Sequence, residues 1–340
     1  MPRGRKEVSV FCRDFSPLRA SVSGRGPDLT PSRPRPASRH VVLAAQLRPN
    51  YSFCILHKIM LGLPAYVVDC HHHFLAPDEP FHATLKKAGA PAYTAEQYKA
   101  DCGNLPITKT VHVEALADDG VGEAASVEAL ASSGACKVAA IVANCDLSAE
   151  DAAERLDKLK SVSQRVKGIR YILDYDGPFD GEICTHFACK EHNTDYLRDP
   201  VAAPAFERGF ALLAERSLSF DLQCCPAQMD AAEAMLKRHP GVPVCIDHLG
   251  KLWRLKADGG EEDTAKIAAW RAAMTKLAAL PQVCCKISML GCVVQGWPGD
   301  PAKEALIKDL VLEVIALFGP KRAMFNSNWH INGCISNSDW

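Results

Sequence analysis

Short apolar runs rich in β-branched residues alternate with longer stretches of mixed polarity between residues 65 and 327. Runs of about four to eight such residues are typical of buried strands, and apolar residues spaced three and four apart are typical of helices that pack on a sheet. The pattern predicts eight strands, at residues 66–70, 110–114, 138–143, 167–173, 219–223, 242–247, 283–288 and 322–327.

Helical segments are predicted between these strands. One opens at Ser148-Ala-Glu-Asp151 with a capping-box-like start and carries an apolar stripe. The last ends at Gly319-Pro320, a usual stop signal. The others are predicted at residues 121–134, 203–216, 227–238, 262–279 and 302–317, with a short helix near 94–101 in a long, irregular first connection at 75–108.

Eight strands that alternate with helices predict an α/β fold, a (β/α)8 TIM barrel. A doubly wound open sheet is the alternative, but no GxGxxG follows the first strand. The chain ends about a dozen residues after its last strand, so the barrel is expected to lack its last helix, as a truncated or naturally shortened chain would.

Residues 1–59 are rich in Arg, Pro and Ser and lack hydrophobic periodicity, which predicts a disordered leader ahead of a barrel domain at 60–340. The leader is either a transit peptide or the product of a wrongly assigned start, with translation beginning at Met60. The first reading predicts an organellar protein and the second a cytoplasmic one.

Charge and cysteine content narrow the class further. The leader carries eleven basic and three acidic residues. Because the whole chain has a net charge of −1, the remaining residues carry a net negative charge, and no nucleic-acid surface is predicted. No apolar run approaches the ~20 residues of a membrane span. The fifteen Cys residues are scattered without a CxxC pair, which indicates reduced thiols in an intracellular protein.

The first strand carries the clearest chemical signal, in the sequence AYVVDCHHHF at 65–74. Side chains alternate between the two faces of a strand, so His71 and His73 are expected to point one way and His72 the other. Two imidazoles on one face at the end of a buried strand can form half of a metal site.

Polar residues recur at the ends of the predicted strands, where the active sites of such barrels lie. Seven of the eight strands contribute, and this convergence favours a single site over scattered polarity. The residues are Asp69, His71, His73, Glu114, Arg170, Asp221, Gln223, Asp247, His248, Lys251, Lys286, Ser288, Asn326, Asn328 and His330.

Several of these residues have structural alternatives. Glu114 and Arg170 could form a structural ion pair, and Asp247 could cap the turn that follows it. His112 is expected to be structural, because it faces away from its neighbours in the strand. His330 is left open, and little is expected of the histidines in loops and at helix ends, His82, His186, His192 and His239.

In these motifs the chain resembles the amidohydrolase superfamily, specifically the amidohydrolase 2 group that includes sugar-lactone and dicarboxylate-lactone hydrolases. The resemblance covers about residues 62–332. Its parts are DCHHH for the strand-1 D-x-H-x-H, FDLQ followed by P-x-Q on strand 5, IDHLGK on strand 6, KIS on strand 7 and MFNSNW on strand 8.

The resemblance implies that His71, His73 and His248 hold one divalent ion, commonly zinc, although some related lactonases work without a tightly bound metal. It also implies that Arg170, Gln223 and Lys251 bind carboxylate or hydroxyl groups of the substrate.

The strand-8 position is a departure from the family pattern. The usual Asp, the general base, is replaced by Asn328, whose amide accepts no proton. A base must then come from elsewhere, and Glu114, Asp247 and His248 are the candidates.

The functional expectation is a hydrolase that opens a lactone, or cleaves a related ester or amide, by attack of water. The expected partner is a small lactone that bears carboxylate or hydroxyl groups, and a homo-oligomer is left open. A metal-dependent decarboxylase is one alternative, and a barrel without catalytic activity, suggested by Asn328, is another.

Overall fold

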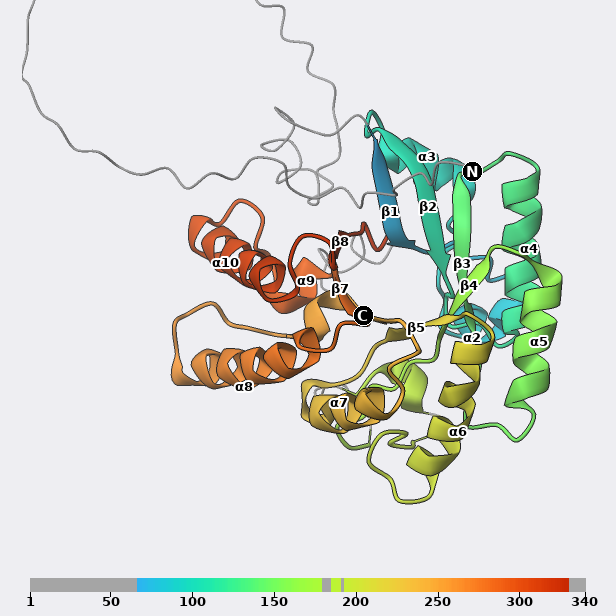
Figure 1. Ribbon diagram of the computed structural model, residues 1–340. Helices are drawn as coiled ribbons and strands as arrows, with labels where there is room; N and C mark the ends of the chain where they lie inside the picture. The colour runs from blue at the N-terminus through green and yellow to red at the C-terminus, as the bar shows by residue number, and fades with distance from the viewer. Residues whose placement is uncertain (1–65, 179–184, 191–192, 330–340) are drawn as a thin grey trace, which may run out of the picture.

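Eight parallel strands form the centre of the computed structural model, which describes residues 66–178, 185–190 and 193–329 (Figure 1). The strands pair in chain order, each with the next. They are β1 Val67–His72, β2 Ile107–Val113, β3 Val138–Asn144, β4 Val166–Arg170, β5 Ser219–Leu222, β6 Val244–Ile246, β7 Val283–Ile287 and β8 Ala323–Phe325.

The residues that follow β8 return to β1. Asn328 N donates to His71 O at 2.8 Å, and His73 N donates to Trp329 O at 2.8 Å. Residues 72 and 329 form an isolated parallel bridge. The sheet therefore closes through the segment after β8, and the strand-8 motif is placed directly beside the histidines of β1.

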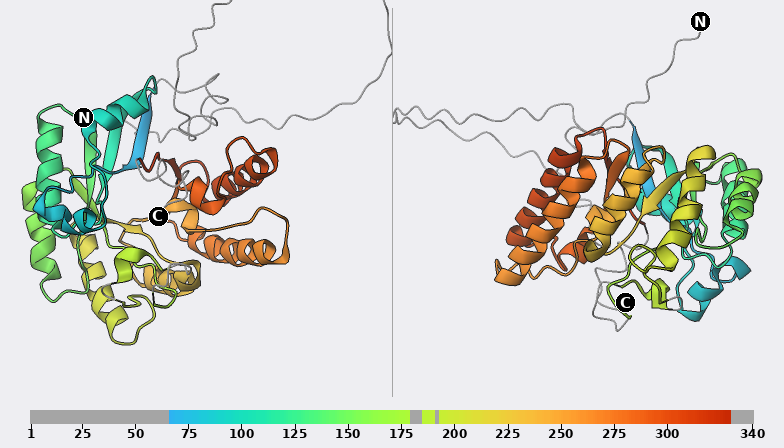
Figure 2. Two further views of the ribbon diagram at one scale, coloured as in Figure 1. Left: turned by 180° about the vertical axis from the view of Figure 1, so that it is seen from behind. Right: turned by 60° about the horizontal axis from the view of Figure 1, so that its bottom comes forward.

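Helices cover the outside of the strands. Figures 1 and 2 show α4, α5 and α6 on one side of the barrel and α8 and α10 on the other. The helices of the described residues are α2 Ala83–Lys87, α3 Ala95–Cys102, α4 Gly120–Ser132, α5 Ala152–Val162, α6 Ala202–Glu215, α7 Met229–Arg238, α8 Glu261–Ala278, α9 Leu290–Val293 and α10 Pro301–Phe318, with short 3-10 turns η2 Pro80–His82, η3 Phe187–Lys190, η4 Pro226–Gln228 and η5 His248–Gly250.

Local sequence explains where several helices begin and end. Thr94 and Gln97 form a capping box at the start of α3. The Asp300 side chain accepts from the first backbone N–H groups of α10, whose first residue is Pro301, and the helix ends at Gly319 with a positive φ of 73°. None of the described helices is both long and apolar enough to cross a membrane.

The (β/α)8 barrel predicted from the sequence is confirmed. Each predicted strand lies on an observed one, although β4 and β8 end earlier than predicted, because the chain leaves the sheet there, and β1 continues to His72. The short helices α2 and α9 lie in segments where no helix was predicted. No helix follows β8 in the part of the chain that the structure describes, and the predicted leader lies outside it.

Candidate active site

Three imidazoles meet at the carboxyl-terminal end of the barrel. His71 and His73 come from the end of β1, and His248 follows β6. The Nε2 atoms of His71 and His73 are 3.2 Å apart, and the rings of His71 and His248 have centroids 4.9 Å apart. All three side chains are buried, at most 4% exposed. His72 points the other way, with its Nε2 2.9 Å from Thr110 Oγ1, as alternation along a strand requires.

The Nδ1 atoms of two of the imidazoles have a close hydrogen-bond partner. His73 Nδ1 lies 2.9 Å from Val113 O, and His248 Nδ1 lies 2.7 Å from Ser288 Oγ. His71 Nδ1 lies 3.3 Å from Lys286 Nζ and 3.5 Å from Asp247 Oδ1. A carbonyl oxygen only accepts, so His73 carries its proton on Nδ1 and keeps a lone pair on Nε2. Outer partners of this kind orient the histidine ligands of metal ions in many proteins.

Burial keeps these imidazoles neutral. It lowers the pKa of His71 and His73 well below the usual value, with the charge of Lys286 adding to the effect at His71 and that of Arg170 at His73. Burial likewise lowers the pKa of His248 to about 3, although Asp247 opposes the change. A neutral imidazole has the free lone pair that a metal ligand needs.

Two buried cations and three carboxylates surround the histidines. Lys286 contacts Asp221 and lies 3.2 Å from Asp247 Oδ1, and Arg170 Nη1 lies 3.6 Å from Asp247 Oδ2. Burial opposes the charge on Lys286, but Asp221 and Asp247 outweigh it and raise the pKa of Lys286. The pKa of Asp247 is lowered despite burial, since Lys286 and His71 favour its ionised form. With Glu114, the cluster keeps one net negative charge.

Glu114 is held by several donors at once. Arg170 Nε donates to Glu114 Oε1 at 2.6 Å, and the other carboxylate oxygen accepts from Ala117 N and Asn144 Nδ2, both at 3.3 Å. Arg170 Nη2 also donates to the Glu114 carbonyl at 2.5 Å. The ion pair considered from the sequence is therefore present at Oε1, and Ala117 and Asn144 bind the other oxygen of the Glu114 carboxylate.

The three residues predicted to bind substrate form one hydrogen-bonded chain. Arg170 Nη1 donates to Gln223 Oε1 at 3.4 Å, and Gln223 Nε2 donates to Asp174 Oδ2 at 2.8 Å. The same Asp174 oxygen lies 2.5 Å from Lys251 Nζ, which also stacks over the ring of Trp253. Asp174 links Gln223 to Lys251, and no motif in the sequence had singled it out.

The turn that carries His248 has an unusual backbone. His248, Leu249 and Lys251 all have φ near 55°, and Gly250 has φ 67°. A left-handed conformation costs a residue other than glycine roughly 1–2 kcal/mol. Trp270 Nε1 donates to Leu249 O at 2.7 Å, and a Cβ on Gly250 would lie 2.6 Å from Met274 Sδ. Packing against α8 therefore holds this turn, and with it His248, in place.

Asn328 completes the inner face of the site. Its Oδ1 lies 3.1 Å from His73 Nε2, and its Nδ2 is buried without a hydrogen-bond partner among the described residues. Because His73 Nε2 carries a lone pair, two acceptors face each other here. Either an ion between them or the reverse orientation of the amide, which is assigned from its surroundings, removes this repulsion.

The remaining predicted positions have structural contacts. Asp69 accepts from Tyr98 Oη at 2.8 Å and from Ser327 N at 2.9 Å, which ties β1 to the segment after β8. Asp247 does not cap the following turn through its side chain, because its carboxylate faces His71 and Lys286. Away from the site, His239 pairs with Glu207, the described cysteines are free thiols, and His192 and His330 lie outside the described residues.

The donors fit a divalent ion. His71, Asp247 and His248 each offer a ligand atom within 4.8 Å of the others, and His73 Nε2 lies beside His71 Nε2. This trio differs from the predicted set by replacing His73 with Asp247, so four side chains are available. The net negative charge of the cluster favours a cation in spite of Lys286 and Arg170.

Comparisons with known proteins agree with this arrangement. The family model described as Amidohydrolase matches residues 68–335. The uncharacterized protein y4mH of Sinorhizobium fredii is 28% identical over 288 residues, 80% of this chain and 88% of that protein. L-fucono-1,5-lactonase of Burkholderia multivorans is 30% identical over 196 residues, 57% of this chain and 58% of its own.

A solved structure extends the likeness to three dimensions. The crystal structure of an amidohydrolase from Burkholderia multivorans with bound zinc has a TM-score of 0.60 and 26% identity, and the match covers 80% of this chain and 87% of that one. The barrel, the motifs at its strand ends and the family match together lead to one conclusion: this chain belongs to the amidohydrolase family.

Proposed function

We propose that this protein is a hydrolase that opens a lactone, or cleaves a related ester, by attack of water at the carboxyl-terminal end of its barrel. The observation that carries the proposal is the meeting of His71, His73 and His248, with the Nε2 atoms of His71 and His73 3.2 Å apart and the Nδ1 atoms of His73 and His248 held by hydrogen bonds. The lactonase relative and the zinc-containing structure give it support.

The same histidines would hold one divalent ion, for which we propose zinc, with Asp247 as a further donor. Such an ion polarises a carbonyl group and lowers the pKa of a bound water toward ~7. The protein supplies neutral imidazoles, a buried setting and rings oriented by Val113 O and Ser288 Oγ. Removal of one of these partners would leave an imidazole free to rotate.

A proton acceptor is still required, since Asn328 has replaced the usual Asp. Both oxygens of Glu114 are occupied by Arg170, Ala117 and Asn144. Neither oxygen of Asp247 accepts a hydrogen bond within the described residues, although Lys286 and Arg170 lie nearby. We therefore assign the proton of the attacking water to Asp247 rather than to Glu114, on geometry alone.

Substrate recognition is assigned to Arg170, Gln223 and Lys251. These side chains present guanidinium, amide and ammonium groups in one connected chain, which suits a substrate with carboxylate or hydroxyl groups. They bind one another in this structure, so the substrate would exchange some of these hydrogen bonds for its own.

The test is a substrate panel with a metal analysis of the full chain. Sugar 1,5-lactones and carboxylated aromatic acids are supplied separately, with proton release and CO2 release as readouts. Lactone opening together with about one metal ion per chain would support the proposal. CO2 release in place of lactone opening would replace it with a decarboxylase.

Absence of turnover with either substrate class would favour a barrel without catalytic activity. Asn328→Asp then provides the second measurement. A large gain in activity would show that the activity was lost through the Asn at position 328. If the wild type does turn over a lactone, an unchanged rate in Asn328→Asp would support another base.

A further inference from the structure

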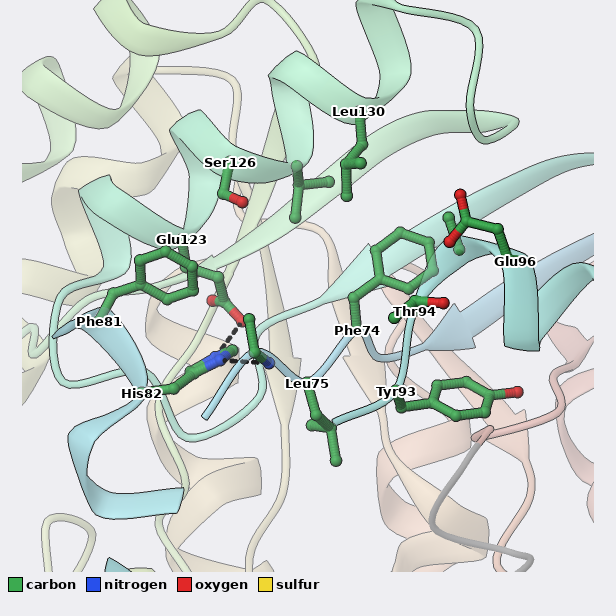
Figure 3. Close-up of a pocket in the computed structure, with 13 residues that line it drawn as sticks. Phe74, Leu75, Phe81, His82, Tyr93, Thr94, Glu96, Glu123, Ser126 and Leu130 are labelled. Atoms are coloured by element: carbon green, nitrogen blue, oxygen red, sulfur yellow. Dashed lines mark hydrogen bonds and ion pairs between the residues drawn. The ribbon is translucent and has the colours of Figure 1, made fainter. Parts of the chain in front are cut away.

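A cavity lies outside the barrel, between the segment after β1 and helix α4. Its volume is about 230 Å³. The apolar walls include Phe74, Phe81, Tyr93 and Leu130, and Glu123 and His82 lie at one end, joined by a hydrogen bond (Figure 3). None of the histidines of the active site lines this cavity. It is therefore a separate space with a polar end.

Glu123 carries all of its hydrogen bonds on one oxygen. Its Oε1 atom accepts from Ala115 N at 2.8 Å, His82 Nε2 at 3.1 Å and His112 Nε2 at 3.3 Å. No hydrogen bond reaches Oε2 from the described residues, and the side chain is only 3% exposed. One buried carboxylate oxygen is thus left without a donor at one end of a cavity whose walls are mostly apolar.

The two histidines beside Glu123 both bind its Oε1 atom through Nε2. His82 Nδ1 accepts from Ala76 N at 3.1 Å, so the proton that His82 donates to Glu123 is on Nε2. His112 Nδ1 is buried without a partner among the described residues. No Lys or Arg of the described chain pairs with Glu123.

A buried carboxylate ordinarily has a cationic partner or a metal ion. Burial raises the pKa of Glu123, but hydrogen bonds from His112 and His82 outweigh it and lower the pKa to about 2. Glu123 is therefore ionised at neutral pH, and among the described residues its Oε2 atom has no donor, since both histidines bind Oε1.

We propose that this cavity binds a small organic ammonium ion with an apolar, ring-sized body. The ammonium group would donate to Glu123 Oε2, and the body would pack between Phe74, Phe81 and Leu130. An apolar cavity of about 150 Å³ accommodates benzene, so this one has room for a ring and a short chain. The aromatic walls favour a cation as well.

The proposal is tested by measuring the binding of benzylamine to the full chain with calorimetry or protein NMR. Benzyl alcohol has nearly the same shape without the charge, and benzoate has the opposite charge. Saturable binding of benzylamine, with the other two compounds at least about tenfold weaker, is the expected result. Equal affinity for benzylamine and benzyl alcohol, or no binding of benzylamine, would overturn the proposal.

Variants locate the site. Glu123→Gln keeps the acceptor oxygen but removes the charge, and it should weaken benzylamine binding at least about tenfold. Leu130→Trp should abolish binding by filling the cavity, and it remains informative if the first variant does not fold. Glu96 is exposed and also lines the cavity, so Glu96→Gln is the matched control. It should change the logarithm of the benzylamine affinity by less than half as much as Glu123→Gln does.

Equal losses in Glu96→Gln and Glu123→Gln would instead indicate a general surface charge effect and would overturn the proposal. Full binding in Leu130→Trp would do the same. These readouts do not depend on catalysis, so the amine site and the lactone-opening reaction can fail separately.

Discussion

Strand β1 separates two buried histidine clusters that differ in their electrostatics. On the inner side, His71 and His73 lie among full charges, including Lys286 and Arg170. On the outer side, His72 contacts Thr110, and the neighbouring histidines bind a single carboxylate, Glu123. Residues only one position apart in sequence thus belong to two different environments.

The difference shows what turns a buried histidine into a candidate ligand. Burial disfavours the charged ring on both sides of the strand. Only the inner rings lie close to further ligand atoms, since His71, Asp247 and His248 each offer one within 4.8 Å of the others. The carboxylates around them also favour a cation. On the outer side, three donors bind the same oxygen of Glu123, and the imidazoles use their Nε2 atoms for this. The group that remains available to a ligand there is the second carboxylate oxygen of Glu123.

The largest effect is expected from breaking the charge balance of the inner cluster. Lys286→Met would leave Asp221 and Asp247 buried without their ammonium partner, and it should lower the free energy of unfolding by about 3–5 kcal/mol. Chemical denaturation measures this. Lys276→Met removes the exposed partner of Asp230 and serves as the control. Equal denaturation midpoints for the two variants would contradict a stabilising role of Lys286 among the buried carboxylates.

The second prediction separates the two faces of β1. His71→Ala should lower kcat/KM for the lactone by more than about 100-fold and should reduce bound metal, because it removes a proposed ligand. His72→Gln, which keeps a donor for Thr110, should stay within a few-fold of the wild type. Comparable losses in the two variants, measured with folded protein, would mean that the inner face is not the reactive one.

The third prediction concerns the outer cluster and its pH dependence. The pKa of Glu123 in the folded protein, about 2, lies below its ordinary value of 4.5, so its stabilising effect is present above 4.5 and is lost as the pH falls toward 2. Between about pH 5 and pH 3 the free energy of unfolding should fall by roughly 1–2 kcal/mol more in the wild type than in Glu123→Gln. Thermal unfolding at the two pH values measures this difference. An equal loss of stability in the wild type and in Glu123→Gln would refute the role of Glu123.

The smallest effect is expected from a change of shape without a change of charge. Arg170→Lys keeps the positive charge of the inner cluster but loses the planar fork that suits a carboxylate. If Arg170 binds the substrate, KM should rise about tenfold while kcat falls less. Steady-state kinetics on a lactone with a carboxylate group measures this. A fall in kcat alone would give Arg170 a role in the reaction step.

Much of the fold follows from patterns within short segments. Buried strands and their covering helices have distinct periods, so the order of eight strands and their connections could be predicted before any contact was known. The same reasoning identified the inner face of β1, because alternation along a strand is a local property. Tertiary packing then set where the strands end, since β4 and β8 are shorter than predicted and β1 and β2 are longer.

The candidate site was only partly predictable. Strand-end positions indicated His71, His248 and Lys286, since parallel strands carry their polar ends to one face. Asp174 was missed because its partners, Gln223 and Lys251, are 49 and 77 residues away in sequence. Asp247 was weighed both as a turn cap and as a candidate base, and only the packing of β1, β6 and β7 directs its carboxylate toward His71 and Lys286.

The sequence by itself determined the barrel and indicated the strand-end location of the candidate site and three histidines proposed as metal ligands, because these depend on periodicity and on side-chain chemistry. Tertiary structure decided which groups face one another: Glu114 with Arg170, Asp174 with Lys251, and Glu123 with two imidazoles. Such pairings join residues far apart along the chain and depend on burial, which raises the cost of an unpaired charge and so makes the partner matter.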